Sequence, residues 1–469
     1  MKYVFYDLET TGRSPQWDQI IQLAAIITDT HLNIVDKINI SCRLKSSCVP
    51  DPEALLVNKI PIRNLYRSNF SLYQLLLTFK ERIDHWKPLI FIGYNSINYD
   101  EEMLRNGFFT NLLEPYYTIK DSNTRSDLLN SVRISNFFYP NIVKSTISEN
   151  GKAIMKLDQL APVNNITAFK AHDAMGDTYA TLELAKIIHS NLPDIWINST
   201  EKMHKKEIEK NISKAPFCYI ESFFGNIKCM VLSYVCLHPK YKWALCFDLK
   251  NNPKDLLDLD TDEQIKFLDS SPKVIRNVKL NKSPILLPLK YKDKLDDYKL
   301  LSNETILDRH NFINNNTSFK DLIIKYYNQK TTQDDNSTSQ LDILAEESIY
   351  KKFISSHDNK LMEEFHRSEW KDRKHIKKQF RDERLNYFAD LLFYHEIPNE
   401  LEKSTYNKIS RSISERLLSK NKEKWLTIYD AYKKIDDLRE KYDNNNDIEA
   451  LTILNELNEY VENMEKKLS

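Results

Sequence analysis

Two acidic residues near the start of the chain have the spacing of a metal site. Asp7 and Glu9 close an aromatic and β-branched stretch that favours a strand over residues 3–8. Because the side chains of a strand alternate between its faces, both carboxylates are expected on the same face. Two such charges raise each other's pKa unless a cation neutralises them. Mg²⁺ or Mn²⁺, which prefer oxygen ligands, fit this pair, and a solvated pair of acids at a strand end is the ordinary alternative.

Three further residues could complete the site. Asp100 follows a predicted strand over 88–93 and a polar loop, and strand ends in α/β sheets commonly open into a ligand crevice. His172 and Asp177 stand five residues apart where a helix is expected to begin. Asp177 has small neighbours that leave room for a ligand, and His172 has the pKa that suits a general base. Asp173 is interpreted as the N-cap of that helix, and an isolated histidine is commonly a surface residue.

The elements that would hold these residues predict an α/β domain over the first part of the chain. Strands are expected over residues 3–8, 20–28, 33–42 and 88–93, and helices over 71–86, 100–108 and a stretch that ends at Pro193. The chain then becomes β-rich, with strand-like segments over 217–220, 229–236 and 242–249. A polar linker is predicted over 328–340, and spaced apolar residues among charges predict a helical domain from residue 345 onward.

Composition excludes several classes of protein. A chain of 469 residues suggests roughly two to four domains. Lys and Arg number 67, as do Asp and Glu, so the chain cannot hold nucleic acid by bulk charge alone. Only 6 residues are glycine, and no glycine-rich phosphate loop is present. Six cysteines show no zinc-site spacing. No apolar run reaches the length of a membrane helix, so we expect a protein that does not cross a membrane. Two acids stand near the N-terminus where a secretory signal would continue its apolar region, so we expect a cytoplasmic protein.

The five candidate residues resemble the catalytic set of the DEDDh 3′→5′ exonucleases, a superfamily with an RNase H-like fold. That set would be Asp7, Glu9, Asp100, His172 and Asp177. The segments 93–102, 126–129 and 171–177, together with Arg105 and Asn106, are similar to bacterial exonuclease I in particular. The resemblance is strong over about the first 190 residues and weaker, though collinear, over the rest.

The resemblance implies three domains. They would be an α/β exonuclease domain over 1–192, a β-rich SH3-like barrel over 193–345 and an all-α C-terminal domain over 346–469. Residues 281–284, Asn-Lys-Ser-Pro, resemble a segment of the family's middle domain. Where the family usually has an arginine before the catalytic histidine, this chain has Lys156. A lysine keeps the positive charge for a phosphate but loses the two-pronged hydrogen bonding of arginine.

The resemblance also implies a reaction. Two Mg²⁺ ions, or Mn²⁺ in their place, would be held by Asp7, Glu9, Asp100 and Asp177. His172 would accept a proton from the attacking water, while Glu9 and Lys156 would contact substrate. Single-stranded DNA would be degraded from its 3′ end to 5′-mononucleotides, in DNA repair and recombination. A monomer is expected, with the C-terminal tail of single-strand-binding protein as its partner.

Two alternatives remain open at the level of sequence. The first is a DEDDh exoribonuclease, although such enzymes are short single domains and this chain has about 280 residues more. The second is a non-catalytic scaffold that binds single-stranded DNA, although all five catalytic residue types are present. Metal-dependent release of mononucleotides distinguishes the nuclease from the scaffold.

Overall fold

The computed structural model describes residues 1–167, 173–200, 205–223, 226–335 and 343–469. The chain divides into two compact units, each described here by itself. The first contains residues 1–123, 168–180 and 342–469, and the second contains residues 124–167 and 181–341. Helix α7 (Ala174–Asn191) begins in the first unit and continues in the second. The domain boundaries predicted at 192/193 and 345/346 stay predictions.

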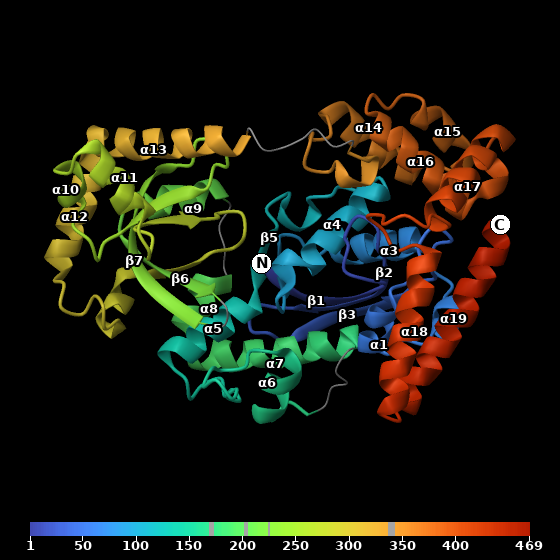
Figure 1. Ribbon diagram of the computed structural model, residues 1–469, viewed down its shortest axis with the longest axis horizontal. Coiled ribbons are helices and arrows are strands. Elements are labelled where there is room, and N and C mark those ends of the chain that lie inside the picture. Colours follow the sequence, from blue (N-terminus) through green and yellow to red (C-terminus); the bar gives the residue numbers. More distant parts are fainter. Residues whose placement is uncertain (168–172, 201–204, 224–225, 336–342) are drawn as a thin grey trace. The chain divides into compact units, whose positions relative to one another are not determined.

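A mixed sheet forms the centre of the first unit (Figure 1), with the strand order β3-β2-β1-β4. These strands are β1 (Lys2–Thr10), β2 (Ile20–Thr28), β3 (Ile34–Ser41) and β4 (Leu89–Gly93). Strand β1 is antiparallel to β2 and parallel to β4. Every residue of β2 and β4 is buried, as expected for strands covered on both faces. All four strands predicted in this region are confirmed.

Two helices cover one face of this sheet, α3 (Leu72–Asp84) and α4 (Asp100–Thr110). Ser71 begins α3 with a capping box, because its side chain and that of Gln74 bond each other's backbone N–H groups. The apolar faces of both helices, including Leu76, Phe79 and Phe108, belong to one core with the strands. The sheet and its helices therefore hold the carboxyl ends of β1 and β4 in fixed positions.

The C-terminal part of the first unit is helical, as predicted. Its helices are α14 (Ser356–Arg367), α15 (Trp370–Lys377), α16 (Glu383–Glu396), α17 (Lys403–Leu417), α18 (Ile428–Asn444) and α19 (Ile448–Leu468). Helices α18 and α19 lie side by side in Figure 1. They share a core with α1 (Pro52–Asn58) and α2 (Ile62–Tyr66). Phe109 of α4 meets Phe388 of α16 edge to face, with ring centroids 4.9 Å apart.

The second unit is built around an antiparallel sheet with the order β10-β6-β7-β8-β9. Its strands are β6 (Phe217–Phe223), β7 (Asn226–Leu237), β8 (Ala244–Asp248), β9 (Ile275–Val278) and β10 (Ile285–Pro288). It also contains β5 (Thr124–Asp127) and helices α5 (Leu128–Phe138), α6 (Leu157–Val163), α8 (Pro193–Thr200), α9 (Lys205–Ile212), α10 (Pro253–Leu257), α11 (Thr261–Asp269) and α12 (Asn303–Asn315). The β-rich character predicted for this region is confirmed.

The linker predicted over 328–340 is wrong for residues 328–335. These residues form the end of α13 (Thr317–Asp335). Buried Phe319 and Ile323 anchor the first turns of this helix, and Lys330, further along, pairs with Asp269. A helix that packing has started continues through polar residues, because each added residue gains a backbone hydrogen bond. Among the helices of the described residues, none has an apolar stretch long enough to cross a membrane.

Candidate active site

The end of β1 supplies the first two acids. Leu8 is buried, whereas Asp7 and Glu9 on either side of it are half-buried, so the two acids share the opposite face of the strand. The register between β1 and β2 shifts between Glu9 and Thr10. Such an irregularity ends regular pairing at the rim of a sheet, where it can redirect the side chains beside it.

The first turn of α7 brings a third acid to this face. The backbone N–H of Gly176 donates to Asp173 Oδ2 at 3.1 Å, so Asp173 caps the helix as predicted. Gln22 Nε2 of β2 donates to the other oxygen of Asp173, also at 3.1 Å. This pair of bonds fixes the start of α7 against the sheet. Asp177 follows one turn later, and single carboxylate oxygens of Asp7, Glu9 and Asp177 lie within 4.8 Å of one another.

Asp100 joins the cluster from the first turn of α4. Its side chain is buried, with 6% of its surface exposed. The charge of Asp100 acts on both Asp7 and Glu9, raising the pKa of each. The structure therefore brings together the four acids that the sequence analysis selected.

The electrostatics of this cluster require a counter-charge. Burial holds the pKa of Asp7 well above its usual range, and the neighbouring Asp100, Glu9, Asp177 and Asp173 raise it further. Burial likewise raises the pKa of Glu9 to about 8, with Asp177 as its strongest neighbour. Because these groups ionise together only when a cation neutralises them, the donor set suits a hard divalent ion with oxygen ligands.

A buried network that the sequence analysis missed attaches α4 to the sheet. Glu101, with 1% of its surface exposed, accepts a hydrogen bond from Tyr6 Oη at 3.2 Å and one from Arg105 at 3.1 Å. Thr118 donates to the same carboxylate. Arg105 in turn donates to Tyr350 Oη at 2.9 Å. The signal available in the sequence was a run of three acids at 100–102, of which only the first was given a role.

The loop after Glu9 shapes one side of the cluster. Tyr99 Oη donates to the carbonyl of Gly12 at 2.8 Å and also bonds Thr10 Oγ1. Gly12 has no room for a side chain, because a Cβ there would lie 2.4 Å from Asp18. A pocket of about 300 Å³ adjoins Glu9 and is lined by Tyr99 and the exposed Arg13. It is large enough for part of a nucleotide.

Two selected residues are not placed beside the acids. His172 lies outside the described residues. Lys156 is the exposed residue that precedes α6, and it belongs to the second compact unit. The roles predicted for both stay predictions.

Comparison with protein families matches nearly the whole chain. The family described as "Exonuclease" matches residues 4–185, the "Exonuclease I SH3-like domain" matches residues 203–329, and the "Exonuclease I C-terminal domain" matches residues 343–464. The order of these matches is the order that the sequence analysis expected.

Individual proteins show the same similarity. The chain is 32% identical over 408 residues to the exodeoxyribonuclease I of Buchnera aphidicola subsp. Schizaphis graminum, covering 82% of this chain and 81% of that protein. Its fold resembles an exonuclease I from Methylocaldum szegediense, with a TM-score of 0.81, 20% identity and 99% of both chains covered. It also resembles E. coli exonuclease I in complex with a dA16 oligonucleotide, with a TM-score of 0.79, 21% identity and 99% of both chains covered.

Proposed function

The chain belongs to the exodeoxyribonuclease I family, and we propose that Asp7, Glu9, Asp100 and Asp177 form the centre at which it cleaves DNA. It is a nuclease that hydrolyses single-stranded DNA in the 3′→5′ direction and releases 5′-mononucleotides. The observation that carries the proposal is the gathering of Asp7, Glu9 and Asp177 oxygens within 4.8 Å beside buried Asp100. Carboxylates this close repel one another, and such a cluster is typical of a site that binds a metal ion.

The enzyme depends on a divalent metal, and we propose Mg²⁺, with Mn²⁺ able to replace it. Asp7, Glu9 and Asp177 would hold one ion, while Asp7 and Asp100 would hold a second. Such ions supply an activated water and stabilise the charge on the leaving 3′ oxygen. The fit rests on the all-oxygen donor set and on the raised pKa values of Asp7 and Glu9, which a bound cation would lower.

The residues that accept the proton and contact the phosphate are assigned from the sequence. His172 would accept the proton of the attacking water, because its ordinary pKa lies near neutrality. Lys156 would contact a substrate phosphate as a point charge. Glu9 would contact the terminal nucleotide, which we place in the pocket beside it, with Arg13 at the pocket's exposed rim.

Further partners are proposed on family membership. Single-stranded DNA is the substrate, and the C-terminal tail of single-strand-binding protein is the expected protein partner. The monomeric state and the cytoplasmic location stay predictions. No observation in the described residues favours the exoribonuclease or the scaffold over the DNA exonuclease.

The test compares four substrates with and without Mg²⁺. They are 3′-labelled single-stranded DNA, 5′-labelled single-stranded DNA, duplex DNA and RNA. We expect Mg²⁺-dependent loss of mononucleotides from the 3′ end of single-stranded DNA only, and a drop of at least about 10³-fold in Asp7→Asn. Asp296→Asn is the matched control, because it removes an exposed acid of the second compact unit. Equal degradation of RNA would favour the exoribonuclease, and DNA binding without cleavage would favour the scaffold.

A further inference from the structure

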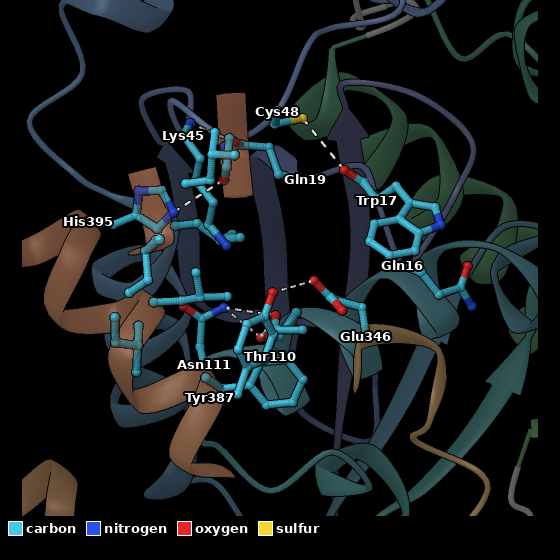
Figure 2. Close-up of a pocket in the computed structure, with 18 of the residues that line it drawn as sticks. Gln16, Trp17, Gln19, Lys45, Cys48, Thr110, Asn111, Glu346, Tyr387 and His395 are labelled. Atoms are coloured by element: carbon cyan, nitrogen blue, oxygen red, sulfur yellow. Dashed lines mark hydrogen bonds between the residues drawn. The ribbon is translucent and has the colours of Figure 1, made fainter. Parts of the chain in front are cut away.

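A second cavity in the first compact unit is separate from the acidic cluster. It has a volume of about 330 Å³ and lies where the loop over residues 15–20 and the segment 45–48 meet helices α4, α16 and α17 (Figure 2). Neither Asp7, Glu9, Asp100 nor Asp177 lines it. Its lining is mixed, with aromatic and aliphatic side chains beside several charged ones.

Lys45 is the unusual residue of this cavity. Its backbone N–H donates to Gln19 Oε1 at 2.7 Å, but among the described residues its ammonium forms no ion pair and no side-chain hydrogen bond. Burial lowers the pKa of this lysine, since a charge surrounded by protein loses hydration. Lys45 is half-buried, and an ammonium that loses part of its hydration without gaining a partner is costly, so its presence requires an explanation.

The carboxylates around the cavity are already engaged by other residues. Glu346 accepts from Tyr387 Oη at 2.9 Å and from Arg416 at 3.2 Å. Asp390 pairs with Lys377. Neither carboxylate pairs with Lys45, which lines the same cavity.

The side chains nearest to Lys45 do not supply its counter-charge. Glu396, with 8% of its side chain exposed, has its nearest cation in Arg43 at 3.9 Å, and it attracts Lys45 from beyond ion-pair distance. Burial lowers the pKa of His395 to about 3 and raises that of the Cys48 thiol to about 12, so both are neutral near pH 7. His395 bonds Ser47 Oγ at 3.2 Å.

The side of the cavity across from Lys45 includes an aromatic ring beside the polar side chains of Gln16 and Glu346 (Figure 2). Figure 2 shows Lys45 and His395 on one side of the cavity and Trp17 on the other. The Trp17 ring contacts the Trp425 ring, with centroids 5.0 Å apart, and the Arg416 guanidinium lies 4.8 Å from its centroid. Phe388 and other side chains of α16 and α17 continue this wall. Three cations line the cavity, of which Arg416 is paired with Glu346 and Lys408 is exposed, so Lys45 is the half-buried cation that faces the Trp17 side.

We propose that this cavity is a binding site for a small organic monocarboxylate, whose carboxylate pairs with Lys45 and whose apolar body packs against Trp17. Lys45, the less exposed of the two lysines that line the cavity, balances one negative charge. A phosphate dianion is disfavoured, because Glu346, Glu396 and Asp390 oppose a second negative charge. A lining that combines hydrophobic and aromatic side chains with a few polar groups is typical of small-molecule sites.

The experiment uses the full-length protein with 3-phenylpropionate as the probe and 3-phenylpropanamide as its uncharged analogue. Calorimetry should show millimolar or tighter binding of the acid, at least about tenfold tighter than the amide. Trp17 fluorescence should report the same binding, and Trp17→Phe should lose most of this signal. Inorganic phosphate, the third probe, should not compete.

Two lysine variants distinguish the proposed role of Lys45 from a general effect of positive charge near the cavity. Lys45→Met should abolish the preference for the acid, whereas Lys408→Met, which removes an exposed lysine at the same cavity, should retain it. Because methionine removes a half-buried charge that has no partner among the described residues, Lys45→Met should also melt no lower than the native protein.

Several results would overturn the proposal. If the native protein bound the acid and the amide equally well, the proposal would be wrong whatever the variants showed. Absence of binding below about 10 mM, competition by phosphate, or undiminished acid binding by Lys45→Met would do so as well. A lower melting temperature for Lys45→Met would show that the lysine serves the fold.

Discussion

Tyr6 Oη of β1 donates a hydrogen bond of 3.2 Å to the Glu101 carboxylate of α4. Each of these residues is the chain neighbour of a candidate metal ligand, since Asp7 follows Tyr6 and Asp100 precedes Glu101. The bond therefore joins the two elements that carry those ligands, immediately beside them. Partners that orient metal ligands commonly affect metal affinity without touching the ion.

Removing this hydrogen bond should weaken metal binding more than it weakens folding. We expect Tyr6→Phe to raise the Mg²⁺ concentration for half-maximal activity by about tenfold, and to cost about 1 kcal/mol of stability. The measurement is DNA hydrolysis as a function of Mg²⁺ concentration, with Tyr66→Phe, an exposed tyrosine, as the control. An unchanged Mg²⁺ midpoint would show that the bond has no positioning role.

Glu101→Gln should be far more harmful to folding than Tyr6→Phe. The substitution leaves Arg105, which is 5% exposed, without its buried carboxylate partner. Breaking such a pair costs about 3 kcal/mol or more, because one charge stays buried without compensation. Urea unfolding of Glu101→Gln and of Glu102→Gln, whose acid is more exposed, provides the comparison. Equal stability of the two variants would contradict the buried ion pair.

The metal-free enzyme should lose stability as the pH rises from about 4.5 to about 8. The pKa of Glu9 is raised to about 8 in the folded chain, so the folded state keeps a proton that the unfolded state releases. The raised pKa of Asp7 acts in the same direction. Melting in EDTA at pH 5.5 and at pH 8 tests this, and Glu9→Gln should flatten the difference. A melting temperature that rises over this interval in EDTA would refute the prediction.

Adding Mg²⁺ should reverse this trend. The ion binds ionised carboxylates, so its stabilising effect should be larger at pH 8 than at pH 5.5, with proton release on binding. Thermal melts across a Mg²⁺ titration at both pH values measure it. The Asp7→Asn variant, which lacks a ligand, should show little stabilisation at either pH.

Two glycines should respond in opposite ways to alanine. At Gly93, a Cβ would lie 2.4 Å from Ser96 Cβ and 3.2 Å from the Tyr6 carbonyl oxygen, so β4 would be pushed away from the start of the site. We expect Gly93→Ala to cost about 2 kcal/mol and to lower activity. At Gly107, inside α4, the nearest atoms would lie at 3.5 Å, and alanine should stabilise the helix by up to about 1 kcal/mol. Urea unfolding of both variants decides between these outcomes.

Arg13 should contribute to substrate binding rather than to the chemical step. It is exposed at the rim of the pocket beside Glu9. Arg13→Ala should raise KM several-fold with little change in kcat, and the slope of log KM against log salt should fall by about 0.7. Arg411→Ala, which removes an exposed arginine of α17, is the matched control. An unchanged salt dependence would show that Arg13 does not contact a phosphate of the substrate.

Local patterns of the sequence were sufficient to predict much of the candidate active site. The alternation of β1 places Asp7 and Glu9 on one face, and the start of α7 is set by Asp173 and the small residues after it. These features depend on neighbours a few residues apart, so strand and helix periodicity predicts them. The helical extension over residues 328–335 was missed, because the residues that anchor it lie earlier in α13.

Only the tertiary structure decided which distant groups meet. Glu101 and Tyr6 are 95 positions apart, and the carboxylates of Asp7 and Asp177 approach each other across 170 positions. Composition and periodicity carry no information on such pairs, since their contact follows from the way helices and strands pack together. The cavity around Lys45 has the same origin. A lysine in a polar segment predicts a solvated charge, whereas in the fold Lys45 is half-buried beside a cavity that α16 and α17 help to line, and burial lowers its pKa.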